Sequence, residues 1–107
     1  CSVLWVSEAG LTEMASAVVT TGLTRHLTLA YLRDGRAALC YQLEAWLGRG
    51  YGHCSILKAV DNSSLLASDS VVVNAATTWN IAATRLGPDT ALVCFSDTSD
   101  AEQGKCR

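Results

Sequence analysis

Apolar residues occur in short runs along this chain and do not form long amphipathic stretches. In the segment 37–42, Cys40 points to one side of an extended chain and Leu39 and Tyr41 point to the other. Both sides therefore carry apolar residues, and the segment 91–96 repeats the pattern. A strand of this kind must be covered on both faces, as in a propeller blade or in the interior of a sandwich.

Turn signals separate these runs. The segment 23–35, read alone, fits a helix that ends at Gly35. A later segment, 78–95, has a similar arrangement but carries β-branched residues and a Gly87-Pro88-Asp89 turn, which is typical of a hairpin. We therefore predict hairpins in both places and an all-β fold.

The two hairpins belong to an internal repeat with a period of about 53 residues, so we divide the chain into residues 1–53 and 54–107. Identity between the halves is low, but cysteines and apolar positions agree together. The matching segments are 1–4 with 54–57, 16–19 with 70–73, 39–41 with 93–95, and 52–54 with 104–106.

Each repeat is expected to form four antiparallel strands, which makes it similar to a propeller blade. We place one strand near 26–32 and 80–86, and a second near 37–42 and 91–96. A third is expected to begin at each of Cys1, Cys54 and Cys106, and a fourth lies near 17–21 and 71–75.

The chain has five cysteines in 107 residues, no Cys-x-x-Cys spacing and only two histidines, which favours disulfides over a zinc site. On the predicted strands, Cys40 can pair with Cys54, and Cys94 with Cys106; buried free thiols are the alternative. Cys1 is then left for a preceding repeat or another copy of the chain.

An oxidising compartment follows from this cysteine usage, and Asn62-Ser63-Ser64 is an N-glycosylation sequon that points the same way. We therefore expect an extracellular or cell-surface location, with glycosylation at Asn62. A net charge of −2 with scattered Lys and Arg gives no footprint for nucleic acid, and no apolar run is long enough to insert into a membrane.

We find no motif for catalysis, a cofactor or a metal, and we expect none of the three. His26 and His53 are best explained as a polar residue at a strand end and a solvated loop residue. A calcium site at Asp97, Asp100 and Glu102 is a weaker alternative to an acidic surface turn.

The segment 43–51 is where the two halves differ most, and it carries Trp46, Arg49 and Tyr51. Exposed Trp, Tyr and Arg form contact sites for sugars or protein partners, so these residues are our candidate contact loop. Trp46 folding back over the hairpin is the alternative. Trp79 lies beside a core strand, and we favour a packing role for it.

The sequence "VVVNA" followed by "ALVCFSD" and "GKCR" resembles tandem cysteine-containing β-propeller-type repeats of large secreted or surface proteins. The first repeat departs from this pattern, because "ALCYQLEAW" lacks the Ser-Asp pair. The resemblance implies blades in a larger assembly. Two blades cannot close a propeller, which needs at least four, so further repeats or copies would have to complete it.

Our first hypothesis is a non-enzymatic, extracellular structural or adhesive module that assembles with flanking repeats or copies into a fibre or a closed propeller. The second is a carbohydrate-binding, lectin-like module that uses the contact loop to bind glycans. The third is a fragment of a secreted propeller hydrolase whose catalytic residues lie outside these repeats.

Overall fold

A computed structural model describes residues 1–7, 10–44, 49–61, 64–99, 101 and 103–107, and this part of the chain is all-β, without a helix. Its strands are β1 (Ser2–Ser7), β2 (Gly10–Ser16), β3 (Thr24–Tyr31), β4 (Arg36–Glu44), β5 (Gly50–Asp61), β6 (Ser64–Ala67), β7 (Val71–Gly87), β8 (Thr90–Asp97) and β9 (Gln103–Cys106).

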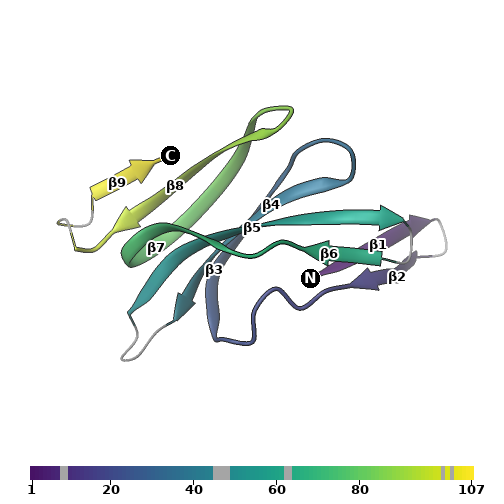
Figure 1. Ribbon diagram of the computed structural model, residues 1–107, viewed down its shortest axis with the longest axis horizontal. Helices are drawn as coiled ribbons and strands as arrows, with labels where there is room; N and C mark the ends of the chain where they lie inside the picture. The colour runs from purple at the N-terminus through teal and green to yellow at the C-terminus, as the bar shows by residue number, and fades with distance from the viewer. Residues whose placement is uncertain (8–9, 45–48, 62–63, 100, 102) are drawn as a thin grey trace.

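The strands form a separate β1–β2 hairpin and one larger sheet in the order β3-β4-β5-β7-β8-β9, with β6 added beside β5. The larger sheet is strongly curled into a half-barrel (Figure 1). The curl brings β3 against β7, where the amide of Ala83 donates a hydrogen bond to the Thr28 hydroxyl (3.1 Å). The β8–β9 ribbon and the β1–β2 hairpin lie at opposite ends of the long axis.

Strand β4 is buried on both faces, as its sequence pattern predicted. On one face Cys40 packs with Ile81, Val93 and Phe95, which come from β7 and β8. A second apolar cluster forms on the other face, where Leu39 and Tyr41 pack with Leu57. The first cluster joins β4 to β7 and β8, and the second joins β4 to β5, so both contain residues from each half of the chain.

The β3–β4 and β7–β8 hairpins have the same register at an offset of 54 residues. Thr28 pairs with Cys40, and Ala82 pairs with Cys94. Both ladders contain a bulge at the same place, and the residues at the two bulges, His26 and Asn80, both have a φ of 51°. A positive φ is uncommon outside glycine.

Disulfides join directly opposed residues of neighbouring strands. Cys40 is bonded to Cys54 across β4 and β5, and Cys94 to Cys106 across β8 and β9, with Cα–Cα distances of 4.1 and 4.0 Å. These are the pairs that the sequence predicted. Cys1 is free and exposed. Two disulfides indicate an oxidising, non-cytosolic environment.

The structure corrects two predicted strand positions. Residues 17–20 are not in a strand, whereas the corresponding segment 71–75 is part of β7 because it pairs with β5. A strand forms at this position of the repeat only where a neighbouring strand is available to pair with it. Among the described residues, no strand pairs with 17–20. Two of the three cysteines expected at strand starts do not lie there: Cys54 lies inside β5, and Cys106 ends β9, whereas β1 begins directly after Cys1.

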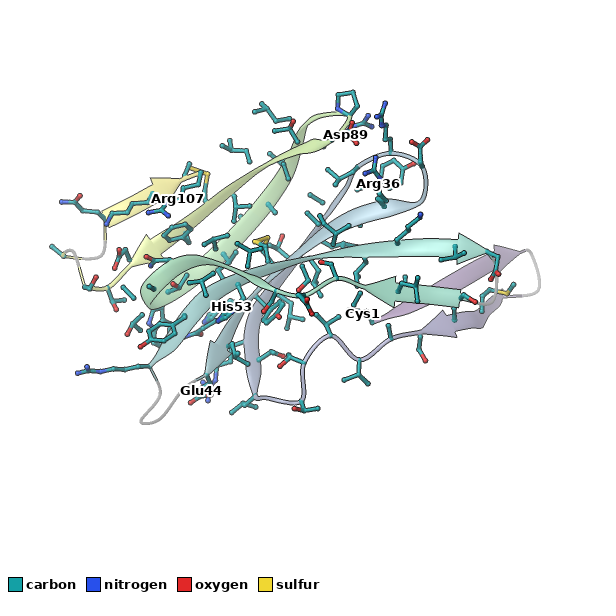
Figure 2. All side chains as sticks on the ribbon, viewed as in Figure 1. Cys1, Arg36, Glu44, His53, Asp89 and Arg107 are labelled. Carbon is teal, nitrogen blue, oxygen red and sulfur yellow. A yellow bond between two sulfur atoms is a disulfide. The ribbon has the colours of Figure 1, made fainter. Side chains whose placement is uncertain are left out.

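Ion pairs connect the tips of the β3–β4 and β7–β8 hairpins. Arg33 and Arg36 both contact the carboxylate of Asp89, at a distance of 2.7 Å for Arg33. Figure 2 shows Arg36 and Asp89 next to each other at the ends of their hairpins. All three side chains are partly exposed, so we expect these ion pairs to contribute less than packing does.

Candidate functional site

A groove of about 480 Å³, lined mainly by residues with polar side chains, opens where β7 and β8 meet the start of β5. It offers one cation, one indole ring, one amide and three hydroxyls. Its lining residues are Arg49, Thr77, Trp79, Asn80, Ser96 and Thr98.

The bulge in β7 presents two consecutive residues to this groove. In a regular strand Trp79 and Asn80 would point to opposite faces. The register shift between Trp79 and Ala82, with Asn80 at positive φ, breaks that alternation, and both side chains are exposed at the groove. Trp79 leans on His26, with ring centroids 5.5 Å apart and an angle of 51° between the rings. One side of the indole is therefore supported while 40% of the residue remains exposed.

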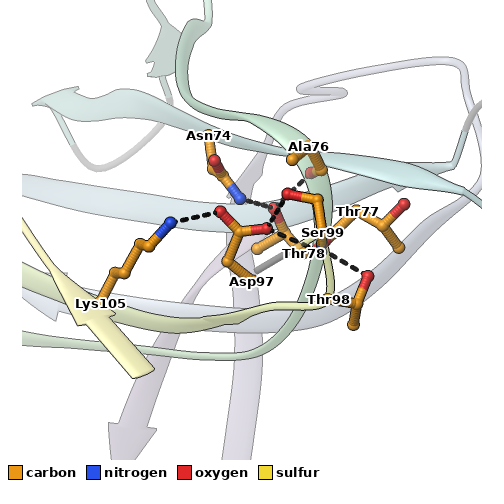
Figure 3. Close-up of polar contacts among 8 residues, drawn as sticks. All are labelled: Asn74, Ala76, Thr77, Thr78, Asp97, Thr98, Ser99 and Lys105. Carbon is orange, nitrogen blue, oxygen red and sulfur yellow. Dashed lines mark hydrogen bonds and ion pairs between the residues drawn. The ribbon is translucent and has the colours of Figure 1, made fainter. Parts of the chain in front are cut away.

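The buried carboxylate of Asp97 lies in the chain between Ser96 and Thr98, which line the groove, and Figure 3 shows its polar contacts. Asp97 accepts hydrogen bonds from the Ser99 amide (3.0 Å) and the Ser99 hydroxyl, and it pairs with Nζ of Lys105 (2.9 Å). These hydrogen bonds, with that from the Ser99 side chain first, lower the pKa of Asp97 to about 2. The carboxylate is thus held ionised and is occupied by its own partners.

A second set of hydrogen bonds fixes the bend in β7 next to Asp97. Asn74 donates to the Thr78 hydroxyl (3.0 Å), which donates to the carbonyl of Ala76 (2.8 Å). Thr98 donates through its hydroxyl to the carbonyl of Thr77 (3.2 Å). Because Thr77 and Thr98 also line the groove, its walls are held by a rigid polar network.

The predicted contact loop is only partly brought to this groove. Arg49 lines it. Tyr51 lies on β5, half-exposed, opposite Leu43 and Thr77, but it is not one of the lining residues. Trp46 lies outside the described residues. Trp79, for which the sequence favoured packing, supplies the aromatic surface instead.

The signal for Trp79 was present in the sequence, since its neighbour Asn80 aligns with His26 in the repeat. Asn and His adopt positive φ more readily than most residues, and a bulge often needs such a residue. The alignment of His26 with Asn80 therefore indicated a bulge at the same place in each hairpin. His26, which was expected at a strand end, is the third residue of β3 and lies at the bulge of that strand.

The prediction that His53 is a solvated loop residue was wrong. His53 lies inside β5, where its ring stacks on Tyr41 at 5.9 Å with an angle of 12°. Its Nδ1 is 3.3 Å from the hydroxyl of Ser70. Burial lowers the pKa of His53 below its usual value of 6.5.

Two further sites fall partly or wholly beyond the described residues. Asp100 and Glu102 of the calcium alternative lie there, and the remaining member, Asp97, is paired with Ser99 and Lys105. Asn62 of the glycosylation sequon is also outside them. Within the described part of the chain, no cluster of three His, Cys, Asp or Glu residues could hold a metal ion, and no helix could cross a membrane.

Comparison with known proteins gives no relative from which a role could be transferred. No family model, no curated protein and no solved structure matches this chain.

Proposed function

We propose that this chain is a non-enzymatic, extracellular structural module that assembles with further copies of its own repeated unit. The main support for this proposal is that the β7–β8 hairpin has the same register as the β3–β4 hairpin. It also packs on the Cys40–Cys54 disulfide through Ile81, Val93 and Phe95. A unit that packs on its own equivalent is the basis of repeat assemblies.

The polar interior supports a bracing role. Asp97 is buried and its oxygens are occupied by Ser99 and Lys105, so it is suited to fixing a turn. His53 stacks on Tyr41, one of the most deeply buried residues in the described part of the chain. The contacts of Asp97 and His53 are therefore with the protein itself, and both side chains serve to hold the sheet together.

Mass measurement tests this proposal. Under denaturing, non-reducing conditions we expect two intramolecular disulfides per chain, and under native conditions we expect masses at multiples of the chain mass that increase with concentration. A chain that stays monomeric across the concentration series would contradict the proposed assembly. Alkylation of all five cysteines without reductant would contradict the oxidising environment.

The groove supports a second candidate function, carbohydrate binding. An indole supported from one side by His26, together with Arg49 and Asn80, resembles the stacking and hydrogen-bonding surfaces that suit sugars. On a glycan array we expect binding that is lost in Trp79→Ala. Tyr31→Ala is the matched control, because Tyr31 is an exposed aromatic residue outside the groove lining. Binding that persists in Trp79→Ala, or no binding at all, would exclude this site.

A further inference from the structure

The groove beside Trp79 contains a positive charge that the fold does not use. Arg49 lines the groove, is exposed, and forms no hydrogen bond or ion pair with another described residue. The backbone that carries it is nevertheless held in place, because the next residue, Gly50, is buried and pairs with Glu44. The side chain of Gln42 occupies the space that a Cβ at position 50 would need. The guanidinium of Arg49 is therefore available to a ligand.

Carboxylates on the neighbouring strands already have partners. Asp97 is the only acidic residue in β7 and β8, and it is paired with Lys105, as Figure 3 shows. Glu44, at the end of β4, is paired with Arg25 at 3.0 Å. In the part of the chain that the structure describes, the charge of Arg49 is thus not balanced from within. The groove is locally positive although the whole chain carries a net charge of −2.

The equivalent place in the first half of the chain is neutralised internally. With the offset of 54 residues between the hairpins, Arg25 corresponds to Trp79 and Glu44 corresponds to Thr98. Arg25 and Glu44 form an ion pair, whereas Trp79 and Thr98 are uncharged and both line the groove. The second half therefore has an open groove with an unpaired cation where the first half has its own ion pair.

The uncharged side chains around Arg49 supply hydrogen-bond donors. Asn80 carries an amide NH₂, and Ser96 and Thr77 carry hydroxyls. The indole of Trp79 adds an N–H and an apolar surface. None of the six lining residues is acidic. A ligand that accepts hydrogen bonds and carries a negative charge therefore fits this lining better than a neutral one.

A second, smaller hollow of about 230 Å³ adjoins the groove. It is lined by Arg49, Thr77, Thr98 and Ser99, so three of its residues also line the groove. Arg49 thus borders both hollows. The groove itself, at about 480 Å³, lies within the range of about 300–1,000 Å³ that is typical of small-molecule sites. A ring in the larger hollow has an aromatic surface on one side and a cation at its border with the smaller hollow.

We propose that this groove binds an acidic glycan, with a sugar ring on the open side of Trp79 and its carboxylate or sulfate group on the guanidinium of Arg49. This inference rests on the carbohydrate-binding function proposed above and names the class of sugar. A guanidinium can donate two parallel hydrogen bonds to such a group, and these are stronger than hydrogen bonds between neutral groups. The amide and hydroxyl donors of Asn80 and Ser96 are then left for the ring oxygens.

The test is isothermal titration calorimetry on the whole chain with four probes. Tetragalacturonate and its fully methyl-esterified form share one sugar backbone and differ in charge, so the ratio of their affinities measures the contribution of the anionic group. Sulfated galactotetraose tests sulfate in place of carboxylate. A tetraglutamate peptide tests whether negative charge alone is sufficient.

Two arginine variants are compared with the wild type, Arg49→Gln and Arg85→Gln. Each removes one positive charge from an exposed side chain. Arg85 lies on β7 outside the groove lining, where its Nε donates to the carbonyl of Gly87 (3.2 Å) and its guanidinium lies over the ring of Tyr31. Arg85→Gln is therefore the matched control for the change in net charge.

We expect the wild type to bind at least one acidic tetrasaccharide about tenfold or more tightly than the esterified one, since the ligand group that meets Arg49 is then charged. Arg49→Gln should lose this preference and keep the binding of the esterified sugar, whereas Arg85→Gln should behave as the wild type. Trp79→Ala should weaken the binding of charged and esterified sugars alike, because both use the indole surface. The tighter of the two acidic sugars identifies the anionic group.

Several results would overturn the acidic-glycan site. Equal affinity for the acidic and esterified sugars, or a preference that survives in Arg49→Gln, overturns it and leaves the carbohydrate-binding function standing. Tetraglutamate bound as tightly as the acidic sugars would show that the groove selects charge and not a sugar, which overturns the site as well. A wild-type chain that binds none of the sugars overturns both the acidic-glycan site and the carbohydrate-binding function.

Discussion

Asp97 shows how one side chain makes part of this fold depend on pH. Its pKa lies at about 2 in the folded chain, below the usual 3.8, because Ser99 and Lys105 stabilise the carboxylate. The contribution to stability is therefore complete above about pH 4 and is lost as the pH falls towards 2. We expect Asp97→Asn to be less stable than the wild type near neutral pH, with the difference shrinking as the pH falls through that range. Urea unfolding at a series of pH values measures this, and parallel curves for the two chains would contradict it.

His53 should act at a higher pH. Burial lowers its pKa in the folded chain, so the unfolded chain binds the proton first as the pH falls below 6.5, and stability decreases. His53→Phe keeps an aromatic ring over Tyr41 but cannot be protonated. We expect thermal unfolding of the wild type to shift to lower temperature between about pH 7 and pH 5 more than that of the variant. An equal shift would assign the pH dependence to other groups.

The two disulfides are similar elements in different surroundings. They close loops of similar sequence separation, 14 and 12 residues, so each is worth about 3 kcal/mol in a chain-entropy estimate. Cys40 also packs in the core, whereas Cys106 is exposed. We therefore expect Cys40→Ala/Cys54→Ala to lower the free energy of unfolding more than Cys94→Ala/Cys106→Ala. Urea titrations compare the two double variants, and equal losses would show that core packing of the first disulfide adds nothing.

Strands and pairings that depend on local pattern were predictable. Alternation identified β4 and β8, and the two-residue difference between the loops kept each cysteine on the correct face for its partner. The sequence pattern could not show that residues 17–20 form no strand. Their equivalent in β7 is a strand because it pairs with β5, and the pattern carries no information on such a partner. His53 was misplaced because the strand was expected to begin at Cys54. Its counterpart Lys105 also lies inside a strand, opposite Phe95, just as His53 lies opposite Tyr41.

The candidate groove was harder to predict than the fold, because its residues come from separate parts of the chain. Arg49 was identified from its residue type and its place in a divergent loop. Trp79 reaches the groove only because of the bulge at Asn80 and the support of His26. A bulge changes which residues share a face, and the simple alternation rule cannot follow it.

At the scale of the whole molecule, the curl of the sheet makes the two halves depend on one another. Phe95 is buried against Cys40, so its removal leaves a cavity between the β4 and β8 layers. We expect Phe95→Ala to lower the free energy of unfolding by about 3–5 kcal/mol. Hydrogen exchange should then show reduced protection in β4 as well as in β8, since a shared core opens as one unit. Leu86→Ala, at an exposed position on the same hairpin, should leave both strands protected. Loss of protection confined to β7, β8 and β9 would instead mean that the halves unfold independently, and that the internal interface is weaker than its burial implies.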